Sequence, residues 1–239
     1  MILASVTLTG ADDSINPAAL AGLSMEFPYV EWGILYGSRT RPRYPSRPWI
    51  DDLRAVAKEN LHGANMRLSA HLCSGWVRSF VLEGKYTFGQ HNDDSMYRRI
   101  QLNFHAHHHP GSPEFLAALR AVKDKQFIFQ MDEVNDDLWK SAHEAEIQAV
   151  PLFDTSGGAG ILPGTWPEPY QHVYCGYAGG LGPENLESQL RAIANVVPGP
   201  VPIWIDMETK VRSKDDEVFD LDKCRKVLEI AAPFIGRRV

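Results

Sequence analysis

The sequence predicts a closed (β/α)8 barrel, an α/β fold formed as one domain by the whole chain, residues 1–239. Three observations predict this fold: eight strand-like runs recur along the chain, amphipathic helices stand between several of them, and each run stops at polar or glycine-rich residues. An open, doubly wound sheet would share this alternation. It would usually carry a glycine-rich dinucleotide turn after its first strand, and Thr9-Gly-Ala-Asp-Asp13 is not such a turn.

The predicted strands are short runs rich in apolar and β-branched residues. They are Leu3–Thr9, Trp32–Tyr36, Ala64–His71, Arg99–Phe104, Phe127–Met131, Ala149–Phe153, His172–Tyr177 and Ile203–Met207. Apolar residues at helical spacing predict helices over Pro48–Lys58, Pro113–Val122, Glu184–Ala194 and Leu221–Ile230. Residues 72–97 and 155–171 contain Gly and Pro and show little helical periodicity, so we expect long loops over one mouth of the barrel.

The amino-acid composition limits the kinds of molecule that the protein is expected to bind. The chain has 24 Lys and Arg against 30 Asp and Glu, a net charge of -6, and no long basic run, which disfavours binding to nucleic acid. Its three cysteines are far apart and lack the spacing of a zinc site or a disulfide framework. No apolar stretch approaches the ~20 residues of a membrane span. We therefore expect a cytoplasmic monomer or homodimer that binds a small anionic, phosphorylated molecule, with no membrane partner, cofactor or metal.

In such barrels the chemistry lies at the C-terminal ends of the strands, where titratable side chains are dense in this sequence. The strongest signal is Gly176-Tyr-Ala-Gly-Gly-Leu-Gly-Pro-Glu-Asn185, in which Gly179 and Gly180 would let backbone amides approach a phosphate at the start of a helix. The alternative is a tight turn that needs positive φ. Asp154 ends a strand and precedes the flexible segment that contains Gly157 and Gly158, which suits a general acid under a lid or, alternatively, a local Asx turn.

Several segments resemble, in order, those of one known family. They are Phe153-Asp-Thr-Ser-Gly-Gly-Ala-Gly160, Tyr177-Ala-Gly-Gly-Leu-Gly-Pro-Glu-Asn185, Ile205-Asp206, Trp32-Gly-Ile-Leu-Tyr36 followed by Arg41-Pro-Arg-Tyr-Pro-Ser46, and Ile100-Gln-Leu-Asn103. The family is phosphoribosylanthranilate isomerase, a (β/α)8 enzyme that performs an Amadori rearrangement of a phosphoribosylated amine. The resemblance implies that Asp154 is the general acid, that Arg43 lies near the aromatic group of the substrate, and that Gly179 and Gly180 hold the phosphate.

The sequence departs from the family at three positions. Thr7-Leu-Thr9-Gly10 stands where the family has Lys-Ile-Cys-Gly, so Thr9 takes the place of the basic cysteine, and a hydroxyl does not accept protons at neutral pH as a thiolate does. Asn103 replaces a histidine, and Glu208 follows the eighth strand in place of a small-residue turn. We therefore expect a divergent isomerase that acts on a phosphorylated or anionic sugar derivative. Its base would be Glu208 or His105, and its binding residues would include Asp206, Lys210 and Arg212.

Two alternatives stay open. The cluster His105-Ala-His107-His108-His109 could bind a divalent metal, with His105 and His107 on one side and Asp132, Asp154 or Glu208 completing the shell, in a metal-dependent isomerase or lyase. The chain could also be a non-catalytic barrel that binds a sugar phosphate or a protein. Asp154 and Glu208 in one pocket would favour an enzyme, whereas a mouth plugged by Trp76 or Trp166 would favour the binding protein.

Overall fold

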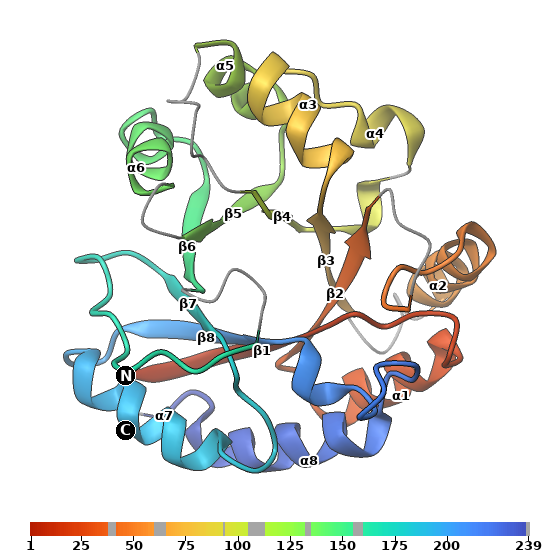
Figure 1. Ribbon diagram of the computed structural model, residues 1–239, viewed down its shortest axis with the longest axis vertical. Helices are drawn as coiled ribbons and strands as arrows, with labels where there is room; N and C mark the ends of the chain where they lie inside the picture. The colour runs from red at the N-terminus through yellow and green to blue at the C-terminus, as the bar shows by residue number, and fades with distance from the viewer. Residues whose placement is uncertain are drawn as a thin grey trace.

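The computed structural model describes residues 1–37, 42–59, 66–92, 94–104, 113–131, 135–154 and 160–237. Among these residues, eight parallel strands close into a barrel in chain order, with β1 paired to both β2 and β8 (Figure 1). The strands are β1 Ile2–Thr9, β2 Val30–Tyr36, β3 Arg67–Leu72, β4 Arg99–Leu102, β5 Gln126–Met131, β6 Ala149–Phe153, β7 Cys175–Ala178 and β8 Pro202–Met207. The closed barrel confirms the predicted fold class and excludes the open sheet.

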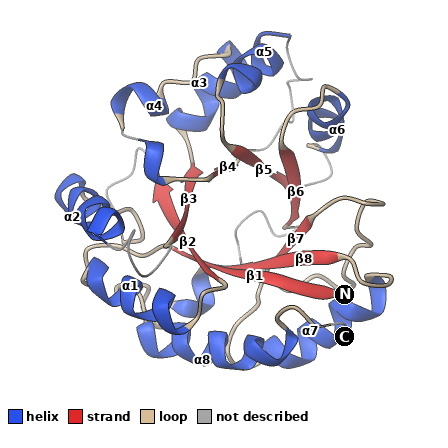
Figure 2. Ribbon diagram, turned by 180° about the vertical axis from the view of Figure 1, so that it is seen from behind, coloured by secondary structure: helices blue, strands red, loops and turns tan. Residues whose placement is uncertain are grey.

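Helices surround the strands (Figure 2). They are α1 Pro17–Glu26, α2 Arg47–Glu59, α3 Gly75–Glu83, α4 Phe88–His91, α5 Pro113–Ala121, α6 Asp136–Glu144, α7 Leu186–Val196 and α8 Leu221–Ala231, with short 3-10 turns η2 Asp94–Met96, η3 Thr209–Val211 and η4 Ala232–Phe234. The side chain of Asp220 caps α8 by accepting the Lys223 N–H at 3.0 Å. No helix in the described ranges is both long and apolar enough to cross a membrane.

Residues 72–97 form helices as well as loops, so the prediction of one long loop there was wrong. Helix α3 buries Val77, Phe80 and Val81, which repeat at the i, i+3, i+4 spacing of a helix face. It ends at Gly84, whose φ of 62° is the left-handed conformation that favours glycine after a helix. The helical signal was present, but it is only one turn and a half long and stands among glycines.

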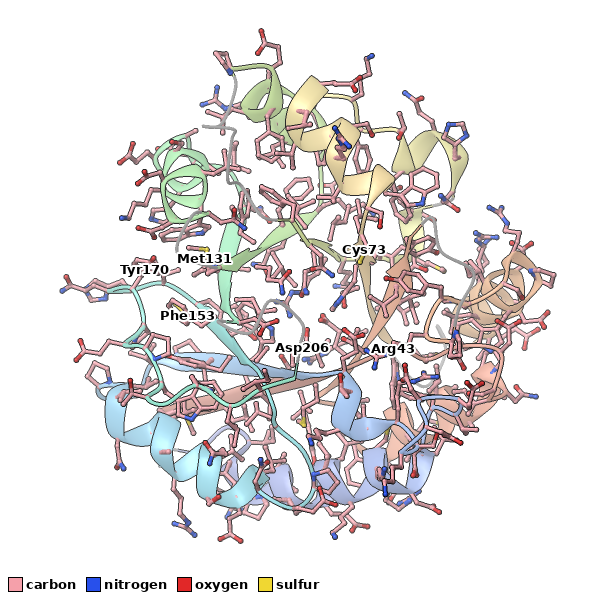
Figure 3. The ribbon with its side chains drawn as sticks, viewed as in Figure 1. Arg43, Cys73, Met131, Phe153, Tyr170 and Asp206 are labelled. Carbon is pink, nitrogen blue, oxygen red and sulfur yellow. The ribbon has the colours of Figure 1, made fainter. Side chains whose placement is uncertain are left out.

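Between β6 and β7, the described residues 160–171 contain neither helix nor strand, in agreement with the loop predicted there, and the strand predicted from His172 begins at Cys175. Aromatic rings pack in this region instead. The ring of Tyr170 stacks on Trp139 of α6, with centroids 4.4 Å apart, and on Phe153 at the end of β6, with centroids 5.7 Å apart (Figure 3). These rings bury the loop against the barrel where a helix would otherwise pack.

The interior of the barrel is divided into a polar and an apolar half. On the polar side, Glu31 of β2 accepts hydrogen bonds from Thr7 of β1 and Arg99 of β4, both at 3.1 Å. On the other side a separate apolar cluster is built from Ile128, Val150, Leu152, Ala178 and Trp204. The Arg99 guanidinium carbon lies 4.2 Å from the centroid of the Trp204 ring, which joins the two halves. Side chains therefore fill the barrel below the mouth.

Gly33 of β2 is expected to be intolerant of a side chain. A Cβ at this position would lie 2.3 Å from Thr9 Oγ1 and 2.8 Å from His71 Nε2, both inside the barrel. Gly33→Ala should lower the free energy of unfolding by about 1–3 kcal/mol, as overpacked cores do, measured by urea denaturation. Gly22→Ala in α1 is the matched control: nothing lies within 4 Å of its added Cβ, so it should stabilise by about 0.5–1 kcal/mol. Equal stability of Gly33→Ala and the wild type would contradict this packing.

Candidate functional site

A cavity of about 210 Å³ opens at the C-terminal ends of the strands. Nine of the predicted site residues line it: Thr9, Arg43, Asn103, Asp154, Gly179, Gly180, Asp206, Glu208 and Lys210. Its other lining residues are Leu35, Tyr44, His71, Cys73, Gln101, Gln130, Leu152, Gly160, Ala178, Leu181, Met207 and Thr209. The structure thus brings together residues from one end of the chain to the other. The predicted residues His105, Gly157 and Gly158 lie outside the described residues.

Asp206 of β8 and Thr9 of β1 form a buried pair at the floor of the cavity. Thr9 Oγ1 donates a hydrogen bond to Asp206 Oδ1 at 2.8 Å, and the two residues are only 1% and 6% exposed. Burial raises the pKa of Asp206 to about 8, against the hydrogen bond from Thr9 and with the help of the nearby Glu208 carboxylate. The carboxyl group therefore holds a proton at neutral pH. Asp206, predicted only as a binding residue, is also a candidate for proton transfer.

Asp154 directly follows β6 and is 6% exposed. Gln130 of β5 donates a hydrogen bond from Nε2 to Asp154 Oδ2 at 2.8 Å, so the neighbouring strand orients the carboxyl group. A Cβ on Gly179 would lie 3.6 Å from Asp154 Oδ1. Asp154 therefore stands beside the glycine turn after β7, where it can reach the same ligand.

The glycine turn after β7 is tightly packed against the loop between β6 and β7. Gly179 and Gly180 have φ values of 112° and 64°, which other residues rarely adopt. A Cβ on Gly179 would lie 2.9 Å from the carbonyl oxygen of Ile161, and one on Gly180 would lie 2.6 Å from the amide nitrogen of Leu162. Both glycines are thus required by close approach of the β6–β7 loop as well as by their φ values.

The start of α7 differs from the prediction. The helix begins at Leu186 and not at Glu184, so Pro183 lies in a turn ahead of it. The side chain of Asn185 closes this turn by accepting the Gly182 N–H and donating to the Gly180 carbonyl, both at 2.9 Å. These local hydrogen bonds compete with helix formation and delay it. The first turn of α7 is therefore farther along the chain from Gly180 than expected.

Arg43 is held over the cavity by acidic groups from two loops, those after β1 and β8. Its backbone has a φ of 83°, rare for a residue with a side chain, and its N–H donates to Asp12 Oδ2 at 2.7 Å. Its guanidinium donates to Asp216 Oδ2 at 2.7 Å and pairs with Glu208. Burial alone would lower the pKa of Arg43, but Asp216 and Glu208 outweigh burial and raise it. Arg43 is thus a permanently charged group fixed at the rim.

Arg212, predicted as a binding residue, does not line the cavity. Its side chain is fully buried, and it donates to the Gly10 carbonyl, to Asp12 Oδ2 at 2.8 Å and to Asp216 Oδ1 at 2.7 Å. Because its donors are already taken by these groups, it binds the loops after β1 and β8 together. Its contribution to the site is the placement of Asp12 and Asp216, which in turn hold Arg43.

The cavity wall also contains residues to which the sequence analysis gave no role. Burial, with a contribution from Arg99, lowers the pKa of His71 to about 3, so its imidazole is neutral; its Nε2 lies 3.1 Å from Ser69 Oγ. Gln101 lies on the inward face of β4, which it shares with Asn103 two positions later, and Gln130 of β5 also lines the cavity. That period of two from Asn103 would have identified Gln101 as a wall residue.

The sequence left two alternatives open: a metal site at the histidine cluster, and a barrel mouth plugged by a tryptophan. Within the part of the chain that the structure describes, no group of three or more His, Cys, Asp and Glu side chains is placed to hold a metal ion, and His105 and His107 lie outside that part. Trp76 packs against Phe88, with ring centroids 5.9 Å apart, and Trp166 packs against Tyr177 at 5.8 Å. Neither tryptophan lines the cavity.

Comparison of the sequence with protein-family models and with curated proteins finds no match. Comparison of the structure with solved structures finds TrpF from Jonesia denitrificans, with a TM-score of 0.59, 15% identity and coverage of 97% of this chain and 98% of that one. The chain has the (β/α)8 fold of phosphoribosylanthranilate isomerase. A structure of phosphoribosyl anthranilate isomerase from Thermotoga maritima matches with a TM-score of 0.55, 15% identity and coverage of 97% and 100%.

A further match is phosphoribosyl anthranilate isomerase in complex with reduced 1-(o-carboxyphenylamino)-1-deoxyribulose 5-phosphate, with a TM-score of 0.55, 15% identity and coverage of 97% and 100%. The coverage means that the phosphoribosylanthranilate isomerase fold extends over nearly the whole chain. In a barrel of this fold the functional mouth is at the C-terminal ends of the strands, and this is where the cavity lies.

Proposed function

We propose that the protein is an isomerase that moves a proton between neighbouring carbon atoms of a phosphorylated or otherwise anionic sugar derivative. The observation that carries the proposal is the convergence of Asp154 from β6 and Asp206 from β8 on one small cavity. Aldose–ketose isomerisation needs positioned groups that give and take protons on carbon and on oxygen. The phosphoribosylanthranilate isomerase fold supports this class of reaction, and the replacement of a basic cysteine by Thr9 supports a diverged substrate.

The acidic residues have separate roles in this proposal. Asp206, whose pKa is about 8, gives a proton to the carbonyl oxygen as it becomes an enol and takes one back later. Asp154, oriented by Gln130, is the general acid toward the oxygen nearer the glycine turn. Glu208 is paired with the Arg43 guanidinium, so its role here is to hold Arg43 over the cavity.

The glycine turn and Lys210 support an anionic ligand. Lys210 lines the cavity, and its Cβ lies 2.6 Å from the place of a Cβ on Gly182. The lysine therefore packs against the segment that follows Gly179 and Gly180, and we infer that its ammonium and the backbone amides of the turn share one phosphate. The volume of about 210 Å³ equals that of about seven water molecules. A small sugar phosphate suits this space, whereas a polymer does not.

A binding screen followed by an exchange assay tests the function. Melting temperatures are measured with inorganic phosphate, pentose and hexose phosphates and an N-phosphoribosylated arylamine, since ligands that bind only the folded state raise the melting temperature. Compounds that bind are then incubated with the protein in D2O, where proton transfer at carbon replaces hydrogen by deuterium. Stabilisation and exchange by at least one phosphorylated sugar are expected. Binding without exchange would favour the non-catalytic sugar-phosphate barrel, and no binding would overturn the proposal.

Lys210→Gln is expected to weaken the binding of inorganic phosphate by about 10- to 150-fold, because a hydrogen bond to a charged group contributes roughly 1.5–3 kcal/mol. The dissociation constant is measured by titration calorimetry. Lys214→Gln removes the same charge from an exposed position that does not line the cavity, and it should leave the constant within about 2-fold. An equal loss of phosphate affinity in both variants would mean that binding depends only on the net charge of the protein and not on Lys210.

A further inference from the structure

We propose that Cys73 is the group that removes the proton from carbon in this cavity, an inference that rests on the proposed isomerase function. Cys73 directly follows β3, is partly exposed and lines the cavity. In the closed barrel β3 lies opposite β7 (Figure 1), and Cys73, Asp206 and Arg43 surround the mouth (Figure 3). A ligand whose phosphate lies at the glycine turn after β7 therefore extends toward Cys73.

A thiol suits this task better than the other groups of the wall. The hydroxyl of Thr9 is committed as a donor to Asp206 and does not ionise near neutral pH. The Glu208 carboxylate is already paired with Arg43, and His71 is buried with a pKa of about 3, so its imidazole accepts a proton poorly. An ordinary cysteine has a pKa near 8.5, close enough to neutral pH for its thiolate to act as a base.

Two side-chain amides, those of Asn103 and Gln101, form a hydrogen-bonded chain that ends at Cys73 Sγ. One atom of this chain indicates that a ligand binds beside the sulfur. Asn103 Nδ2 donates to Cys73 Sγ at 3.3 Å, the Cys73 thiol donates to the His71 carbonyl oxygen at 3.9 Å, and Gln101 Nε2 donates to Asn103 Oδ1 at 2.8 Å. Gln101 is 5% exposed and lines the cavity, and its Oε1 has no partner among the described residues. A buried acceptor without a donor is costly. A ligand hydroxyl next to Cys73 would supply that donor.

The other two cysteines provide internal controls. Cys175 and Cys224 are buried, and neither lines the cavity. Burial raises the pKa of the Cys175 thiol to about 11 and raises that of Cys224 well above its usual range. A thiol reagent should therefore distinguish Cys73 from both in the native protein.

The proposed step balances without an oxidant or reductant. The Cys73 thiolate takes the proton from C2 of an open-chain aldose, the electron pair of that C–H bond forms the C1–C2 double bond, and Asp206 gives its proton to the carbonyl oxygen. In the second half, the thiol returns the proton to C1 and Asp206 takes the proton from the C2 hydroxyl. The aldose has then become a ketose, and both groups are restored.

The first test is alkylation of the native full-length protein by iodoacetamide from pH 5 to 10, with the modified cysteine identified by mass spectrometry. We expect modification at Cys73 alone, with a pH midpoint near the ordinary thiol value of about 8.5, and a rate at least ~10-fold lower when a pentose 5-phosphate saturates the cavity. Asn103→Asp places a carboxylate beside the sulfur and should raise the midpoint by about one pH unit. A Cys73 that is unreactive, or that is not protected by the sugar phosphate, overturns the proposal.

The second test is turnover. Cys73→Ser should lower kcat for the sugar phosphate identified by the exchange assay by about 100-fold or more, leave its dissociation constant within about 2-fold, and abolish the alkylation, whereas Cys175→Ala should change none of these. If Cys73→Ser turns over the substrate at the wild-type rate, the role of Cys73 as the base is wrong, but the proposed isomerase function is unaffected. If the wild type isomerises no sugar phosphate while Cys73 is still protected from alkylation, the isomerase function and the basic role of Cys73 both fail, and a ligand-facing thiol remains.

Discussion

Lowering the pH from 7 to 5 is expected to stabilise the wild-type protein by about 3 kcal/mol through Asp206 alone. Burial raises the pKa of this carboxyl group to about 8 in the folded protein, whereas an aspartic acid in an unfolded chain titrates near 3.9. Between these values the folded state carries one more proton than the unfolded state. The contribution to stability is complete below about pH 4 and is lost as the pH rises toward 8, at about 1.4 kcal/mol per pH unit.

Asp206→Asn separates this contribution from those of the other titrating groups. An asparagine resembles the neutral acid and keeps an oxygen that can accept the 2.8 Å hydrogen bond from Thr9, so the variant should fold at both pH values. Urea denaturation of both proteins at pH 5, 6 and 7 gives the difference. We expect the wild type to lose stability relative to Asp206→Asn with each pH step, and Asp52→Asn on the exposed surface of α2 to parallel the wild type. Parallel curves for the wild type and Asp206→Asn would mean that Asp206 is ionised when folded.

The fold could be predicted because each strand carries its own signal. The predicted runs agree with the observed strands to within three residues at either end, since local apolar patterning fixes a strand and parallel strands of this spacing close in one known way. The location of Asp154, Asp206 and Glu208 at one mouth followed from the same rule. A residue's position at the end of a strand therefore carries most of the information about which side chains meet.

The chemistry of individual groups could not be predicted in the same way, because it depends on partners far away in the sequence. Arg212 and Arg43 are both arginines in polar loops, yet one is buried against Asp12 and the other faces the cavity. The pKa of Asp206 depends on its burial beside Thr9, which lies 197 positions away in the sequence. Such effects arise from tertiary packing, and no local pattern contains them.

Asp154→Asn is expected to lower kcat for the sugar phosphate by about 100- to 10,000-fold, because the amide keeps the shape of the carboxyl group but transfers no proton. Phosphate binding should be unchanged, because the amide has nearly the same size as the carboxyl group beside the glycine turn, where a Cβ on Gly179 would lie 3.6 Å from Asp154 Oδ1. Turnover therefore falls while binding is retained, which a general loss of structure does not produce. Initial rates and calorimetric titration of phosphate measure the two quantities, with Asp52→Asn as the matched control. A variant that retains a third of wild-type turnover would remove Asp154 from the reaction and leave proton transfer to Asp206 and Cys73.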